Sequence, residues 1–306
     1  MINAGDRTSL DVVTVRHRHA EWPVLVRHPR LRPGEHPSGL VIELHGSQSD
    51  ARTQMALSGL HDVADAERFV VAAPQGALRM PGDTDPDGGW GWNVPGVPTT
   101  AGDLPPADAR DDVGFLMRVI DEICVRADVR KRAAWMAGFS GGARMAAAFA
   151  VRHPERVTAL AAVAGLRAGR PRPDDPSAPD PTDFPSGPPV PVVAFHGTGD
   201  PVNAYDGDGS LRWGYPVEVA ARTWARRNGA VQDAGRRSIA PGVSRIRYSG
   251  RDARSEVMLY VTAGDGHTWP GSSIDMAMDG LGSKTESISA TTEIRAFFRR
   301  HGPDAP

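Results

Sequence analysis

The stretch GFSGG, Gly138–Gly142, lies where an apolar run changes into an alanine-rich one, within RAAWMAGFSGGARMAAAFA (132–150). The apolar run predicts a buried strand, and GARMAAAFAVRHP (142–154) predicts a helix that ends before proline. A nucleophile elbow needs a strand, a sharp turn and a helix, and flanking glycines let that strained turn form without Cβ clashes. The helix N-terminus would also favour negative charge developing at the turn. These features predict that Ser140 is a nucleophile rather than a solvated serine in an ordinary glycine-rich turn.

Strand and helix patterns alternate along the rest of the chain. Apolar runs predict buried strands at 39–46, 69–74, 157–165, 190–197 and 256–264, an antiparallel opening pair at 10–17 and 22–28, and a late strand at 244–249. Helical spacing is present at 50–66, 107–129, 216–229 and 287–302. This alternation predicts a mostly parallel central sheet with helices on both faces. The organisation expected is a single domain over 1–306, with Gly- and Pro-rich loop insertions at about 75–107 and 167–190.

The composition excludes several classes of protein. A net charge of −2 and dispersed arginines give no general attraction to nucleic acid or to an anionic membrane, and no apolar run has the length of a membrane span. The one cysteine, Cys124, excludes an intrachain disulfide and a cysteine metal cluster. No HExxH or phosphate-binding loop motif is present, so neither a metal nor another cofactor is predicted. The N-terminus MINAGDRTSLDVVTV has no signal-peptide pattern, and the expected location is the cytoplasm.

A serine nucleophile requires a histidine base, which should follow both the serine and the acid along the chain. Only His267 and His301 come late enough. His301 ends the terminal helix in FFRRHG and is interpreted as a solvated charge at a helix C-terminus. His267 lies in AGDGHTWPG, a glycine-rich loop directly after a predicted strand, and is the candidate base.

The candidate acid is Asp200, which follows the predicted strand at 190–197 in the turn TGDPV. Active-site groups of α/β sheets lie at the C-terminal ends of parallel strands, and this position fits. Asp206 and Asp208, in YDGDG, are the competitors and are interpreted as turn residues. Asp265 is too close in sequence to His267 to be an independently placed partner.

An oxyanion hole needs two backbone N–H donors. One is expected from Gly141, the residue after the serine, and the other from Ser47 or Gln48 in the loop HGSQSD. His45 and His196 also stand at strand ends before glycine. They precede the expected position of the base and are interpreted as structural residues that hydrogen-bond neighbouring loops.

Several motifs resemble those of known families, in matching order: LHGSQSDA, GWNVPG, DDVGFLMRVID, GFSGGARMA, FHGTGDPV, PVEVAARTWARRNG and GDGHTWPG. Together they resemble the polyhydroxybutyrate depolymerase and feruloyl esterase families, and most of all the LpqC-type esterases related to carbohydrate esterase family 1. The resemblance runs from about Leu40 to Phe298. It implies an α/β-hydrolase fold and cleavage of a small-molecule or oligomeric carboxylic ester. The matching triad positions are Ser140, Asp200 and His267.

Four tryptophans are candidates for substrate binding. Trp90 and Trp92 lie in the first long loop, Trp269 is two residues after the candidate base, and Trp213 follows the acid loop. Trp92 and Trp269 resemble family positions beside the active site. Rigid aromatic side chains would suit a flat aryl acyl group or a sugar, but the same residues could instead anchor their loops on the domain.

Other functions use the same fold or the same machinery. A thioesterase, a lactonase or a peptidase would also use a serine triad, and a non-catalytic relative could bind a ligand or partner. Family members often read HGCGG where this chain reads HGSQS, and NGC where it reads NGA. Those cysteines belong to exported proteins. A cytoplasmic enzyme that acts on a soluble ester is therefore the interpretation that fits this sequence best.

Overall fold

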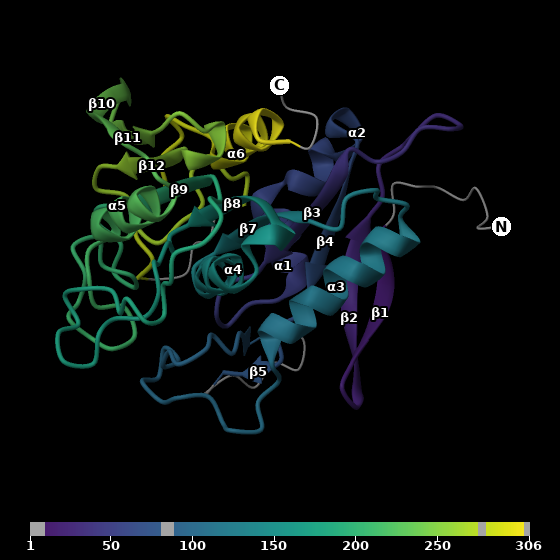
Figure 1. The fold of residues 1–306 in the computed structure, drawn as a ribbon, viewed down its shortest axis with the longest axis horizontal. Helices are drawn as coiled ribbons and strands as arrows, with labels where there is room; N and C mark the ends of the chain where they lie inside the picture. The colour runs from purple at the N-terminus through teal and green to yellow at the C-terminus, as the bar shows by residue number, and fades with distance from the viewer. Residues whose placement is uncertain (1–9, 81–88, 275–279, 303–306) are drawn as a thin grey trace.

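The structure is a computed structural model that describes residues 10–80, 89–274 and 280–302. In these ranges one sheet has ten strands in the order β1-β2-β4-β3-β7-β8-β9-β12-β11-β10. The strands are β1 (Asp11–His17), β2 (Ala20–Arg27), β3 (Gly39–Leu44), β4 (Phe69–Pro74), β7 (Ala134–Phe139), β8 (Val157–Val163), β9 (Val192–Gly197), β10 (Gln232–Ala240), β11 (Val243–Ser249) and β12 (Val257–Thr262). The six central strands, β4-β3-β7-β8-β9-β12, are parallel to one another. The strands at both ends of the sheet pair antiparallel. Figure 1 shows β1 and β2 at one end and β10 and β11 at the other.

Helices cover both faces of this sheet. They are α1 (Ala51–Ser58), α2 (Ala64–Glu67), α3 (Asp112–Arg126), α4 (Gly141–Arg152), α5 (Val217–Arg227) and α6 (Ala290–Arg300), with short 3₁₀ turns at Leu60–Val63, Pro154–Arg156 and Ala253–Ser255. Helices α3, α4 and α5 contribute side chains to one apolar cluster, whereas α1 and α6 contribute to another. The mostly parallel sheet with helices on both faces, predicted from the sequence, is confirmed.

The apolar run of β3 illustrates why this stretch becomes a central strand. Successive side chains of a strand point to opposite faces, and a strand covered on both faces must be apolar at every position. Leu40 and Ile42 pack into the cluster with α3 and α4, and Val41 between them packs into the cluster with α1 and α6. Apolar side chains of the strand therefore face both layers of helices, and Glu43 is its one charged residue.

The structure differs from the predicted elements in three places. The helix expected over 50–66 is broken at Gly59, which has φ 60° and donates its N–H to the Met55 carbonyl. A left-handed glycine that bonds back to the last turn ends a helix. Strand β10 was not predicted, and two short strands, β5 (Leu78–Arg79) and β6 (Trp90–Gly91), lie in the first long loop. Residues 81–88 of that loop lie outside the described residues.

The second predicted insertion, 167–190, contains no helix or strand in the structure and forms only a bridge between Pro171 and Pro179. Across the described parts of the chain, no helix combines the length and the apolar character needed to cross a bilayer.

A buried carboxyl group, Glu43, stands on β3 with no exposed surface. Its Oε2 accepts a hydrogen bond of 2.6 Å from Ser58 Oγ, while Oε1 has no hydrogen-bond partner among the described residues. Burial raises the pKa of Glu43 to about 8. A carboxyl whose folded pKa lies above its unfolded one favours folding less as pH rises, because the unfolded chain gives up the proton first.

Glu43→Gln is therefore expected to flatten the dependence of stability on pH. Between the ordinary pKa of 4.5 and about 8, Glu43 should lower the free energy of unfolding of the wild type. The decrease should be up to about 1.4 kcal/mol per pH unit. Urea unfolding of both proteins at several pH values measures the difference. Parallel slopes for wild type and Glu43→Gln would contradict the assignment.

Candidate active site

Ser140 stands on the turn between β7 and α4, with φ 53° and ψ −117°. A positive φ is uncommon for a residue other than glycine, and such strained positions cluster at functional sites. Its N–H donates to the Val163 carbonyl at 2.9 Å, which fixes the turn. A Cβ on Gly138 would lie 2.5 Å from the Gly142 carbonyl carbon, and one on Gly142 would lie 2.1 Å from the Leu44 carbonyl oxygen. The two glycines of the motif are therefore required by the close approach of the backbone around the serine.

Asp200 and His267 meet after the ends of two neighbouring parallel strands, β9 and β12. The Nδ1 atom of His267 lies 2.8 Å from Asp200 Oδ2, and the two side chains are 5% and 0% exposed. The ring of Phe139, the residue before Ser140, has its centroid 5.0 Å from that of the His267 imidazole. The imidazole is therefore hydrogen-bonded to the predicted acid and packed beside the strained turn.

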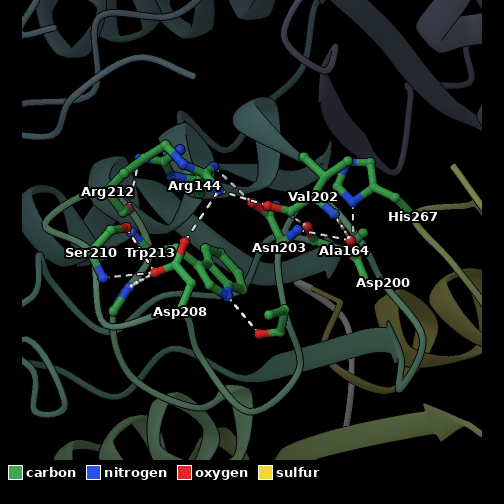
Figure 2. Close-up of polar contacts among 12 residues, drawn as sticks. Arg144, Ala164, Asp200, Val202, Asn203, Asp208, Ser210, Arg212, Trp213 and His267 are labelled. Carbon is green, nitrogen blue, oxygen red and sulfur yellow. Dashed lines mark hydrogen bonds and ion pairs between the residues drawn. The ribbon is translucent and has the colours of Figure 1, made fainter. Parts of the chain in front are cut away.

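The carboxyl group of Asp200 receives hydrogen bonds at both oxygens. Its Oδ1 accepts the backbone N–H groups of Val202 at 2.9 Å and Asn203 at 2.8 Å (Figure 2). Burial alone would raise its pKa, but hydrogen bonds from His196 and His267 outweigh burial and hold the pKa of Asp200 well below its usual range. Asp200 is therefore an ionised, fully engaged carboxylate. The competing residue Asp206 is exposed.

His196 has a contact with the acid that the sequence analysis did not predict. Its Nε2 lies 3.2 Å from Asp200 Oδ2 and 2.7 Å from the Asn203 carbonyl oxygen. Both partners are acceptors, so Nε2 carries a proton. The ring stacks on Trp213 at a centroid distance of 5.7 Å. His196 is thus structural, as predicted, and it also contacts the candidate acid; its spacing of four residues from Asp200 was the available signal.

The loop after β3 lies against the first turn of α4. A Cβ on Gly141 would be 2.5 Å from Ser47 Oγ and 3.3 Å from Ser47 N. The Gly141 N–H belongs to the first turn of the helix, where no intrahelical acceptor exists. Gln48, next in the loop, has φ 60°. The structure therefore brings the predicted donor residues together beside Ser140.

Hydrogen bonds of His45 and Trp92 hold the loop after β3 in place. His45 Nδ1 donates to the Gly46 carbonyl at 2.8 Å, and its Nε2 accepts the Gly76 N–H at 2.9 Å, which confirms its structural interpretation. Burial lowers the pKa of His45 to about 4, so the ring is neutral at neutral pH. The indole N–H of Trp92 donates to the His45 carbonyl at 2.8 Å.

Of the tryptophans expected to bind substrate, Trp213 and Trp269 have no exposed surface and Trp92 is 5% exposed. The indole N–H of Trp269 donates to Thr291 Oγ1 at 3.0 Å, and its ring belongs to the core cluster under α6. Their burial favours the alternative that the sequence left open, in which these side chains anchor loops. Trp90 alone among the four is only partly buried, with Arg79 5.0 Å from its ring centroid.

No model of a known protein family matches the chain. The chain is 28% identical over 277 residues to "Putative esterase NocK" of Nocardia uniformis subsp. tsuyamanensis. The aligned region covers 85% of this chain and 73% of that protein. An acetyl xylan esterase from Aspergillus awamori superposes with a TM-score of 0.59 at 16% identity, over 94% of this chain and 99% of that one. An S-formylglutathione hydrolase from Agrobacterium tumefaciens superposes with a TM-score of 0.55 at 14% identity, over 96% of this chain and 97% of that one.

This chain has the α/β-hydrolase fold. Ser140 lies at a turn from a strand into a helix, which is the local geometry of a nucleophile elbow. The fold implied by the resemblance is therefore confirmed. Because structural likeness at such low identity concerns the fold alone, the chemistry must be argued from the site itself.

Proposed function

We propose that this protein is a serine hydrolase that cleaves carboxylic esters through Ser140, His267 and Asp200. The observation that carries the proposal is the buried 2.8 Å hydrogen bond between His267 and Asp200, packed beside the strained turn of Ser140. The similarity over 85% of the chain to a protein named as an esterase supports the same class of reaction.

The hydrogen bond between His267 and Asp200 determines the role of each ring nitrogen. Because Nδ1 donates to the carboxylate, Nε2 has its lone pair free to accept the Ser140 hydroxyl proton. The serine Oγ attacks the ester carbonyl carbon. The resulting oxyanion accepts hydrogen bonds from the backbone N–H groups of Gly141 and of Ser47 or Gln48. His267 then protonates the leaving alcohol, and water hydrolyses the acyl-enzyme by the reverse proton transfers.

The resemblance in sequence narrows the proposed substrates to hydroxybutyryl and feruloyl esters, with acetyl esters as the simplest comparison. The test is a panel of p-nitrophenyl acetate, a feruloyl ester and a hydroxybutyryl ester, assayed with wild type and with Ser140→Ala. A thioester, a lactone and a peptide in the same panel examine the other reactions of such a site. Turnover of an ester that disappears in Ser140→Ala supports the proposal, and no turnover of any ester contradicts it.

Trp269→Ala is expected to destabilise the fold without changing which ester is preferred. Removal of a fully buried indole should lower the free energy of unfolding by about 3–5 kcal/mol. The ratio of kcat/KM for feruloyl over acetyl esters should stay that of wild type, because the ring has no exposed surface. Trp90→Ala is the control with a partly exposed ring and should cost less stability. A changed ratio in a stably folded Trp269→Ala would make Trp269 part of the substrate pocket.

A further inference from the structure

A pocket lined by arginines lies between the first long loop, α4 and the loop 167–190. Its walls include Val94 and Val97 from the first loop and Ala147 from α4. Its lining includes one acidic residue, Asp183, and five arginines: Arg144, Arg152, Arg167, Arg170 and Arg212. None of these arginines has a part in the proposed ester chemistry.

Three of the five arginines have acidic partners. The pairs are Arg152 with Asp183 at 2.8 Å, Arg170 with Asp180 at 3.0 Å, and Arg212 with Asp208 at 3.7 Å. The other two arginines, Arg144 and Arg167, form no ion pair with a carboxylate among the described residues.

Arg144 and Arg167 are each only 6% exposed. Arg144 donates to the Arg212 carbonyl at 3.2 Å, whereas Nε and both Nη atoms of Arg167 have no hydrogen-bond partner in the described parts of the chain. The Arg167 guanidinium lies over the Trp213 ring, 3.0 Å from its centroid, and its buried N–H groups have no acceptor among the described residues. Burial lowers the pKa of both arginines to about 9, and both remain charged at neutral pH. Two buried cations without an anion are costly, and a bound anion would remove that cost.

The pocket is joined to the candidate active site through two of these residues. Arg144 follows Ser140 by one turn of α4 and donates its backbone N–H to the Ser140 carbonyl at 3.1 Å. The side chain of Arg212 donates to Asn203 Oδ1 at 2.9 Å and to the Val202 carbonyl at 2.6 Å, directly beside the acid loop (Figure 2). Two residues of the pocket wall therefore contact the turn of Ser140 and the loop that carries Asp200.

We propose that this pocket binds a free carboxylate carried by the ester substrate, so that the enzyme acts on half-esters of dicarboxylic acids. This inference rests on the proposed function. The forked donors of a guanidinium match the two oxygens of a carboxylate. The pocket is narrow, because only about 20 Å³ admits the centre of a water molecule. A cavity needs about 10–15 Å³ by this measure to hold one water, so a single small polar group fits.

The test compares p-nitrophenyl half-esters of dicarboxylic acids from glutarate to suberate, each with its methyl-capped partner of the same chain length. Uncatalysed hydrolysis is subtracted for each compound. At the best chain length, wild type should prefer the free acid by about tenfold or more in kcat/KM, the effect of a charge-assisted hydrogen bond. Arg167→Met should bring this ratio close to one, Arg167→Lys should keep part of it, and Arg222→Gln on α5, outside the pocket, should keep all of it.

A second measurement covers the case in which Arg167→Met does not fold. The free dicarboxylate should inhibit wild type competitively, and its diamide should not. A wild-type ratio near one, a ratio unchanged in folded Arg167→Met, or inhibition that is not competitive would each overturn the carboxylate assignment while leaving ester hydrolysis intact. If neither member of any pair is hydrolysed in a Ser140-dependent way, the proposed function fails, and this inference fails with it.

Discussion

Ser140→Ala is expected to lose ester hydrolysis by about 10³-fold or more in kcat, because the side chain that forms the acyl-enzyme is gone. Stability should change little, since the strained backbone is held by the hydrogen bond to Val163 and by the close approach of Gly142 to Leu44, neither of which involves the hydroxyl. Steady-state assays and urea unfolding measure the two quantities.

Labelling by a fluorophosphonate probe provides the control for this prediction. Wild type and Ser210→Ala, a serine of the loop after the acid, should both be labelled, whereas Ser140→Ala should not. Turnover retained in Ser140→Ala, with the background excluded, would show that another group is the nucleophile.

Asp200→Asn is expected to lower kcat by about 10³–10⁴-fold with the fold intact. An amide carries no charge to stabilise the His267 imidazolium. It would also present N–H groups to nitrogens that already donate, those of His267 at 2.8 Å and His196 at 3.2 Å. The preferred orientation and tautomer of the base would therefore be lost.

Asp206→Asn, at an exposed position in the same loop, is the matched control and should change kcat little. Because the pKa of Asp200 lies well below its usual range, protonation of this carboxyl should not reduce activity in mildly acidic solution. An effect of Asp206→Asn as large as that of Asp200→Asn would make Asp206 the acid instead of Asp200.

The sequence was sufficient for those parts of the site that depend on local pattern. A buried strand followed by GFSGG and a helix predicts the strained turn at Ser140, and the structure has φ 53° there. Asp200 and His267 could be named because each follows a predicted parallel strand, and adjacent parallel strands bring their carboxyl ends to one edge. The structure places these two residues in hydrogen-bonding contact.

Features that depend on which segments pack together were not predictable in this way. Trp269 looks the same in the sequence whether it faces a cleft or packs under α6, and only the tertiary structure shows its complete burial. The arginine pocket joins Arg144 on α4 to Arg167 in a loop without regular structure, so no periodicity relates them. Strand β10 is exposed at nearly every position, and an edge strand of this kind lacks the apolar run by which the other strands were recognised.

The central claim is that Ser140 is the nucleophile and that the His267–Asp200 pair activates it. Trapping the acyl-enzyme tests this claim most directly. Wild type is mixed with p-nitrophenyl acetate, quenched in acid within the first turnover, and digested for peptide mass spectrometry. The expected result is one acetyl group, on the peptide that carries Ser140, formed far more slowly in His267→Ala. An acetyl group on a different residue, or rapid release of p-nitrophenol with no acyl-enzyme on Ser140, would contradict it.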